Sequence, residues 1–380
     1  MYFDVDYYWR VIRHVWRLKQ WPGRRALLFR LLVITPPLTL FHALCFLLDY
    51  VFFPRLWWQR VTAPVFIVGH ARSGTTLMHR LMSADGDRFS YFLYWETFFP
   101  SLVQKKCIRL LGKVDALCGS PVLKKLQAWD DKTFGPFRHM HDMSLWNSEE
   151  DQFVMRAAFV TQQWSTDLPV LEVIDLFHVD EMPHKRRRWM RHYRECVKRQ
   201  LLLNGSNKIH LSKNPVMSGW VGSIIETFPD ARIVVMMRDP KQCIPSLLKL
   251  VEISWRAKGW GKDDYQASLE ILRNLSFESF HNPAEQLAKH PDTPHSVVDY
   301  RKLISDPRGT VHEVYDSLGL PLSAGFDNFL QAKAEREKNH ASKFEYSMGD
   351  YALSDTMIET ELAAFYARYD WPRSAPATTE

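Results

Sequence analysis

The chain has 380 residues, of which 46% are hydrophobic and 24% are charged, and its formal net charge is +6. This composition excludes global disorder and allows one large α/β domain with insertions or two modest domains. A nucleic-acid-binding protein would show a denser basic stripe, so we expect no nucleic-acid partner. The mild positive charge suits a small anionic molecule or an acidic membrane surface.

The first 60 residues form a basic and apolar segment. Residues 26–53 are strongly apolar and follow six Lys and Arg side chains, an order that resembles a signal anchor. Ionisable residues and a proline pair interrupt the run: Arg30, Pro36-Pro37, His42 and Asp49. Its longest part without an ionisable residue, residues 31–41, is shorter than the ~20 residues that cross a bilayer, and the prolines predict a helix break. We therefore favour helices that lie on the membrane surface or pack on the domain over a membrane span.

Strands and helices alternate from residue 64 onward. An apolar run at residues 65–68 predicts a buried parallel strand, and residues 75–82 predict a helix behind it. Further strands are predicted at residues 208–212, 232–237 and 296–300, helices at 221–228 and 241–251, and a loop at 255–264. The alternation predicts an α/β fold of the P-loop type, with a mostly parallel sheet flanked by helices.

We expect residues 61–365 to form the main domain. Residues 97–200 are mostly helical in pattern and rich in Trp, Phe and Arg, so we interpret them as an insertion that shapes an acceptor pocket. The basic cluster at residues 185–188 is interpreted as a solvated helix face, with a patch for acidic lipid as the alternative. Residues 366–380 are predicted to be a flexible tail. Five cysteines without zinc-site spacing indicate free thiols in a reducing compartment.

The loop that runs from Gly69 through Gly74 carries the clearest chemistry. A glycine-containing loop between a buried strand and a helix offers unpaired backbone N–H groups and the positive end of the helix dipole to an anion. Its Gly-x-x-x-x-Gly spacing matches the phosphate loop of nucleotide triphosphatases, but Thr75 replaces the lysine that reaches the β- and γ-phosphates. A terminal phosphate or phosphosulfate therefore suits this loop better than ATP. Four side chains must hold the anion instead of the lysine: Arg72, Ser73, Thr75 and Thr76.

Four segments resemble the sulfotransferases that use 3′-phosphoadenosine 5′-phosphosulfate (PAPS). Residues 66–82, FIVGHARSGTTLMHRLM, resemble the family's 5′-phosphosulfate loop in the arginine-bearing form of tyrosylprotein and many bacterial sulfotransferases. The other segments follow in the family's order: LSKNP at 211–215, RIVVMMRDPKQCIPS at 232–246 and VVDYRKLISDP at 297–307. The resemblance implies sulfuryl transfer from PAPS to an acceptor hydroxyl, with adenosine 3′,5′-bisphosphate as product and no metal.

The resemblance also implies that Arg238 and Ser246 bind the donor's 3′-phosphate and that Tyr300 lies near the adenine. The positions of the first two support this. Arg238 ends an apolar strand, where ligands of α/β proteins bind, and Ser246 lies about two helical turns further on. An ion pair between Arg238 and Asp239 is the alternative. The glycine- and lysine-rich loop over the 3′-phosphate of cytosolic sulfotransferases is missing, and residues 338–347 are a candidate substitute.

Three residues are candidates for acid–base chemistry. Glu96 follows Arg72 at about the distance of the family's catalytic glutamate, and its aromatic neighbours can raise its pKa by desolvation. Lys213 is predicted at the carboxyl edge of the sheet, and the resemblance assigns it to the bridging oxygen of the leaving nucleotide. His141, next to a carboxylate, is an alternative base, and no third ligand accompanies it for a metal site. The acidic run at residues 147–151, NSEED, resembles a recurrent family segment whose role stays open.

Two other functions are weighed against a sulfotransferase. A nucleotide kinase or ATPase would need the missing lysine and a strand ending in a magnesium-binding aspartate. A non-catalytic membrane-surface protein would not need the set Arg72, Glu96, Lys213, Arg238 and Ser246. The apolar N-terminus and the aromatic insertion indicate a lipid, steroid or other amphipathic alcohol or phenol as acceptor, with a carbohydrate hydroxyl as the alternative. We therefore expect a cytoplasmic enzyme with peripheral membrane contact through residues 1–60.

Overall fold

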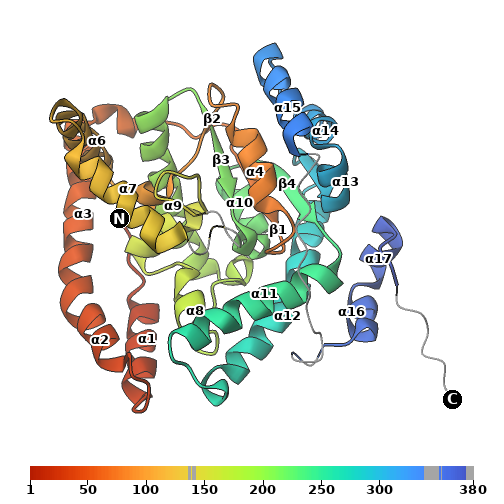
Figure 1. The fold of residues 1–380 in the computed structure, drawn as a ribbon, viewed down its shortest axis with the longest axis horizontal. Helices are drawn as coiled ribbons and strands as arrows, with labels where there is room; N and C mark the ends of the chain where they lie inside the picture. Colours follow the sequence, from red (N-terminus) through yellow and green to blue (C-terminus); the bar gives the residue numbers. More distant parts are fainter. Residues whose placement is uncertain (136–137, 139–142, 338–350, 352, 374–380) are drawn as a thin grey trace.

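The structure is a computed structural model that describes residues 1–135, 138, 143–337, 351 and 353–373 (Figure 1). A parallel sheet of five strands lies at its centre, in the order β2-β3-β1-β4-β5. The strands are β1 (Val65–Gly69), β2 (Phe89–Ser90), β3 (Ile209–Lys213), β4 (Arg232–Met237) and β5 (His295–Asp299). The predicted α/β fold is confirmed, and every strand predicted from an apolar run is present. β2 was not predicted, because two residues are too short to show a pattern.

Helices cover both faces of the sheet. Phe66 and Val68 of β1 face one hydrophobic core, whereas Val65 and Ile67 face a second, as the alternation of side chains along a strand requires. The helices that follow the sheet strands are α4 (Thr75–Ser83), α10 (Val221–Thr227), α11 (Pro240–Ala257), α12 (Lys262–Lys289), α13 (Tyr300–Ser305), α14 (Pro307–Ser317) and α15 (Ala324–Glu337). The loop expected at residues 255–264 is shorter than predicted, because α11 and α12 extend into it from both sides.

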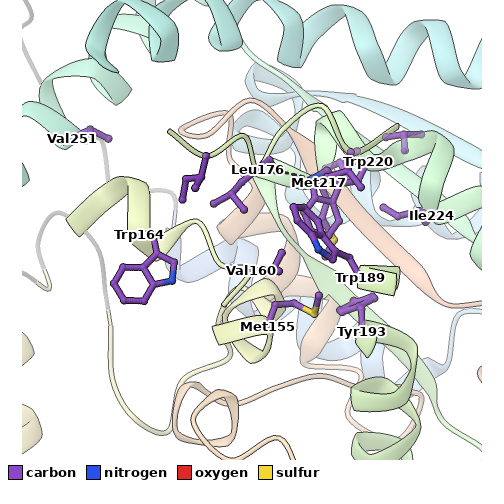
Figure 2. Close-up of a cluster of buried hydrophobic side chains, with 14 of the residues drawn as sticks. Met155, Val160, Trp164, Leu176, Trp189, Tyr193, Met217, Trp220, Ile224 and Val251 are labelled. Atoms are coloured by element: carbon purple, nitrogen blue, oxygen red, sulfur yellow. Dashed lines mark hydrogen bonds between the residues drawn. The ribbon is translucent and has the colours of Figure 1, made fainter. Parts of the chain in front are cut away.

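The helical insertion packs on the first of these cores. It contains α5 (Tyr94–Thr97), α6 (Leu102–Leu117), α7 (Pro121–Phe134), α8 (Gln163–Asp167) and α9 (Pro183–Asn204). Trp189 of α9 lies beside Trp220, with ring centroids 5.9 Å apart, and both indoles are fully buried (Figure 2). The Trp220 indole N–H donates to the Leu176 carbonyl at 2.8 Å. These contacts join the insertion to the segment that follows β3.

The N-terminal segment packs into the hydrophobic core that Phe66 and Val68 face. Val11 and Val15 of α1 (Val5–Arg17) are fully buried in it. Helix α2 (Arg24–Phe29), a π turn (Arg30–Ile34) and α3 (Thr35–Phe52) then form one helical segment of 29 residues, long and apolar enough to cross a membrane. The helix break predicted at Pro36-Pro37 is wrong. Both prolines lie in the first turn of α3, where a missing N–H is tolerated, and the π turn precedes them.

The C-terminal part contains α16 (Asp355–Glu361) and α17 (Ala363–Tyr369). The flexible tail expected from residue 366 differs from the structure over residues 366–373. Helix α17 extends to Tyr369, and Trp371, two residues further on, is buried against the Tyr366 and Tyr369 rings. A single tryptophan outside any periodic pattern did not reveal this docking from the sequence.

Candidate active site

The phosphate-binding loop joins β1 to α4 with two glycines in conformations that other residues rarely adopt. Gly69 has a φ of 130°, and a Cβ there would lie 2.3 Å from the Met236 carbonyl oxygen. Gly74 has a φ of 95° at the start of α4, and a Cβ there would lie 2.5 Å from the Tyr300 ring. Since no side chain caps α4, the amides of its first turn are available to an anion.

Two hydroxyl-bearing residues of this loop are buried at the helix start. Ser73 is fully buried, and its Oγ has no hydrogen-bond partner within the described part of the chain. Thr75 is also buried and lines the cavity described below, as does Thr76. A buried hydroxyl without a partner is costly. An anion oxygen placed at the loop would satisfy Ser73, so the residues present fit a phosphate or phosphosulfate.

Three residues predicted from two further segments, Ser246, Arg238 and Tyr300, gather at this loop beside Arg72. Arg72 Nε donates to Ser246 Oγ at 3.1 Å, which connects the loop to α11. Arg238 Nη1 donates to the Arg72 carbonyl at 2.9 Å, and its guanidinium lies 4.4 Å from the centroid of the Tyr300 ring. The ends of β1, β4 and β5 therefore bring together residues separated by up to 228 positions in the chain.

In the described part of the chain, the guanidinium groups of Arg72 and Arg238 donate to neutral acceptors: Ser246, Gln242 and the Arg72 carbonyl. Among the described residues, neither Arg72 nor Arg238 has a carboxylate within ion-pair distance. The alternative ion pair between Arg238 and Asp239 is not formed, because Asp239 instead accepts from the Lys241 backbone N–H at 3.0 Å and from the Tyr366 hydroxyl at 3.1 Å. Two uncompensated guanidiniums beside a helix N-terminus form a site for a doubly anionic group.

A cavity of about 910 Å³ opens beside the cluster. Part of its wall is formed by Arg72, Gly74, Arg238, Ser246 and Tyr300. Another part is apolar and comes from α11, α12 and the insertion: Phe153, Leu171, Leu247, Val251 and Leu272. The volume is in the range of ligand sites that hold a nucleotide-sized molecule, and the mixed wall suits a charged donor next to an amphipathic partner.

An acidic pair faces the same cavity. Lys213, at the end of β3, is buried, and its Nζ lies 3.1 Å from Glu149 Oε1 and 3.2 Å from Glu150 Oε1. Both glutamates line the cavity, whereas Lys213 lies behind them. Burial raises the pKa of Glu150 although the Lys213 ammonium opposes it. Burial alone would lower the pKa of Lys213, but the Glu150 and Glu149 carboxylates raise it above its ordinary value.

Asp151 fixes this acidic segment to the sheet. Its Oδ1 accepts from the Ser212 hydroxyl at 2.8 Å, and its Oδ2 contacts His210 Nε2 at 2.9 Å and also accepts from the Tyr193 hydroxyl. The partners Ser212 and His210 belong to β3, so the hydrogen bonds place Glu149 and Glu150 at the carboxyl end of that strand. The sequence carried the signal in the run NSEED, but nothing in the run itself revealed its partner strand.

Glu96 lies in a different environment. It is fully buried, and its Oε2 accepts from the Leu93 backbone N–H at 3.0 Å and from Gln200 Nε2 at 2.6 Å, while Oε1 accepts from Arg109 Nη2 at 2.9 Å. It is not part of the cavity wall among the described residues. This geometry favours a structural role at the start of α5 over proton transfer to a ligand in the cavity.

Two predictions fall on residues that the structure does not describe. His141, the alternative base, and residues 338–347, the candidate cover of the 3′-phosphate, lie outside the described ranges. Within those ranges, no group of three His, Cys, Asp or Glu side chains is arranged to hold a metal ion.

Comparison with known proteins identifies the family. The model of the Sulfotransferase family matches residues 64–324 of the chain. The chain belongs to this family. It is 26% identical over 322 residues to the omega-hydroxy-beta-dihydromenaquinone-9 sulfotransferase Stf3 of Mycobacterium bovis and of Mycobacterium tuberculosis, an alignment that covers 82% of this chain and 76% of those relatives.

Solved sulfotransferase structures share the fold. Sulfotransferase STF9 from Mycobacterium avium superposes with a TM-score of 0.71 at 16% identity, over 98% of this chain and 94% of that one. Sulfotransferase STF1 from Mycobacterium tuberculosis superposes with a TM-score of 0.66 at 19% identity, over 95% and 93%. The match to the family model and the alignment with named sulfotransferases show an enzyme that transfers a sulfuryl group to an acceptor, so the kinase, ATPase and non-catalytic alternatives are wrong.

Proposed function

We propose that this sulfotransferase takes the sulfuryl group from PAPS and transfers it to a hydroxyl of a lipid-like, amphipathic acceptor. The observation that carries the donor assignment is the meeting of Arg72, Ser246, Arg238 and Tyr300 at the start of α4. The loop amides and Ser73 would hold the 5′-phosphosulfate, and Arg238 with Ser246 would hold the 3′-phosphate. No metal is required, because guanidinium and amide groups supply the positive charge.

The acceptor proposal rests on the apolar wall of the cavity. Leu171, Leu247, Val251 and Leu272 form an apolar surface close to the donor cluster. A lipid or steroid alcohol needs an apolar wall and few polar groups near its hydroxyl, whereas a carbohydrate would use the polar side chains that also line the cavity, among them Gln162, Gln163 and Thr166. The relatives with a curated function act on a hydroxylated dihydromenaquinone, which agrees with a lipid alcohol. A phenol is the second acceptor class that this wall accommodates.

For the general base we propose Glu150 in place of Glu96. Its side chain lines the cavity and is 18% exposed, so it can reach a bound hydroxyl. Glu149 is less accessible, because one of its carboxylate oxygens also accepts from the Glu150 backbone N–H at 3.0 Å. In the transfer, Glu150 accepts the hydroxyl proton while the acceptor oxygen forms its bond to sulfur. The bond from sulfur to the bridging oxygen breaks, and Arg72 with the loop amides stabilises the charge that develops on the sulfuryl oxygens.

Lys213 acts in this proposal as a positioning residue. Its ammonium lies between the two glutamates and holds both carboxylates at the cavity wall. It also keeps a positive charge next to Glu150, which limits how far burial raises the pKa of that carboxyl. The role at the bridging oxygen that the family resemblance implies for Lys213 stays a prediction, because that role needs the ammonium to move past the glutamates.

The donor proposal is tested by removing one guanidinium. Arg238→Ala should weaken binding of adenosine 3′,5′-bisphosphate by about 2 kcal/mol, about 30-fold, because a charged hydrogen-bond donor to the phosphate is lost. Calorimetric titration without magnesium measures this. Arg308→Ala, on the partly exposed face of α14, is the matched control and should bind like the parent. Parent-like affinity of Arg238→Ala would contradict the 3′-phosphate assignment, and tight binding of ATP that requires magnesium would contradict PAPS.

The acceptor class needs a separate measurement. Incubation of the enzyme with ³⁵S-labelled PAPS and matched panels of lipid alcohols, steroids, phenols and sugars should label the first class most strongly. Label found only in the sugar panel would overturn the acceptor proposal and leave the donor assignment intact.

A further inference from the structure

Exposed apolar side chains gather on three neighbouring helices, α3, α6 and α7. On α3, Leu40 is 71% exposed and Leu47 is 64% exposed, and on α6, Leu117 is 89% exposed and Leu111 is 66% exposed. Trp129 of α7 is half exposed. Together we call the exposed apolar side chains of these three helices the apolar face. Soluble proteins rarely leave so many large apolar side chains uncovered on neighbouring helices, so the apolar face indicates a partner.

Polar contacts hold the members of the apolar face together. Asp49 of α3 accepts from the Leu102 and Val103 backbone N–H groups at 3.1 and 2.7 Å, which fixes the first turn of α6 to the end of α3. Further along, the His42 ring is hydrogen-bonded to Gln104 of α6. In Figure 1, α3 runs along the left edge of the molecule with α6 beside its upper end. The hairpin of α6 and α7 therefore extends the surface of the N-terminal segment instead of closing over the cavity.

The segments that contain the apolar face are basic, as is the neighbouring helix α9, which contains eight Lys and Arg against one Glu. Residues 1–60 contain nine Lys and Arg against three Asp, and residues 102–134 contain seven against three. These two segments thus carry a net charge of +10, whereas the whole chain carries +6 and the remainder −4. An anionic partner would be attracted to this side of the molecule.

Tryptophans border the apolar helix. Trp9 and Trp16 of α1 precede it, and Trp57 and Trp58 follow it; all four are about half exposed or more. Trp9 and Trp16 line an open groove of about 430 Å³ that also contains two Arg side chains. Tryptophan and arginine side chains are typical of the headgroup layer of a bilayer, where an indole meets both apolar and polar groups.

We propose that the apolar face docks the enzyme on an anionic lipid bilayer as a monotopic protein, with the α6–α7 hairpin as a second anchor beside α3. A crossing of the bilayer by residues 24–52 does not fit, because α1 before the helix packs in the core and the residues after it lead directly into β1. A second copy of the chain would bring two surfaces of high positive charge together, which opposes dimerisation through this face. The proposal deepens the lipid-acceptor proposal but does not depend on it.

The test is flotation of the full chain with vesicles of equal parts phosphatidylcholine and phosphatidylglycerol. The parent should float with these vesicles, and binding should weaken with pure phosphatidylcholine and with added salt, because the anionic headgroups are lost or screened. The double variant Leu111→Ser, Leu117→Ser should bind about a hundredfold more weakly, about tenfold for each leucine withdrawn from the lipid. Ile304→Ser with Phe329→Ser, exposed on α13 and α15, is the matched control and should bind like the parent.

Binding of adenosine 3′,5′-bisphosphate verifies that each variant is folded, and it separates this test from the test of the donor site. Absence of the parent from the floating fraction would overturn the proposal, as would equal flotation of parent and double variant. A parent that sediments as a dimer without lipid, and becomes a monomer on changing the two leucines, would assign the apolar face to self-association instead.

Discussion

Glu150→Gln is expected to lower kcat by about 10²–10⁴-fold, the usual contribution of a positioned general base. The amide keeps the size of the side chain but cannot accept the hydroxyl proton. Adenosine 3′,5′-bisphosphate should bind the variant with nearly the parent affinity, because the donor cluster of Arg72 and Arg238 is not among the hydrogen-bond partners of Glu150. Steady-state turnover with ³⁵S-labelled PAPS and titration of the bisphosphate measure the two quantities.

Glu96→Gln provides the comparison that separates the two candidate bases. Glu96 accepts three hydrogen bonds in the protein interior. Its replacement should therefore lower the free energy of unfolding and leave the kcat of the folded enzyme close to the parent value. If the folded Glu96→Gln variant were inactive while Glu150→Gln turned over at the parent rate, the base role would return to Glu96. If both variants kept the parent rate, His141→Ala would be the next variant to measure.

The pH profile of kcat gives an independent readout. A base must be ionised, so turnover falls when the pH drops through the pKa of Glu150. Since burial raises that pKa, the acid limb should lie above the ordinary value of a glutamate, about 4.3. Glu150→Gln should lose this limb. The carboxylates also raise the pKa of Lys213, so its ammonium persists through neutral and mildly alkaline pH and adds no alkaline limb there.

The donor site was largely predictable because its parts are local. The phosphate loop and α4 are contiguous, and Arg238 and Ser246 are separated by one strand end and about two helical turns. Parallel strands place their carboxyl ends at one edge, so three short motifs in order are sufficient to predict that they meet. What the sequence could not predict is the direct contact of Arg72 with Ser246, because it depends on how α11 approaches the loop.

The acid–base residues were harder to predict because their environments come from distant segments. The aromatic neighbours of Glu96 correctly indicated burial, but its hydrogen-bond partners Arg109 and Gln200 belong to α6 and α9. Conversely, Glu150 faces the cavity because Asp151 is bonded to two residues of β3, about sixty positions away. A local pattern can show that a carboxylate is desolvated, but not whether its partners are a ligand or the protein.

Asp49 illustrates the same difficulty in the N-terminal segment. In the sequence it interrupts an apolar run and argues against a membrane span. In the structure it is fully buried, where it accepts from Arg199 Nε at 2.6 Å and from the Ser101 hydroxyl at 2.8 Å in addition to the two amides at the start of α6. The Asp49 carboxylate thus joins α3 to α6 and α9. The same charged residue that interrupts the apolar run in the sequence holds the apolar helix α3 on the protein.

Asp49→Ala is therefore expected to lower the free energy of unfolding by about 3–5 kcal/mol. It leaves the buried Arg199 guanidinium without one of its two carboxylates, and it removes the acceptor of two backbone N–H groups in the first turn of α6. Urea unfolding followed by circular dichroism measures this. Asp6→Ala, which breaks ion pairs of a half-exposed aspartate with Arg10 and Lys185, should cost less than about 1 kcal/mol. Equal losses in the two variants would mean that the junction does not secure α3. A selective loss in Asp49→Ala would mean that α3 and α6 are held in place by the protein itself before any membrane is present.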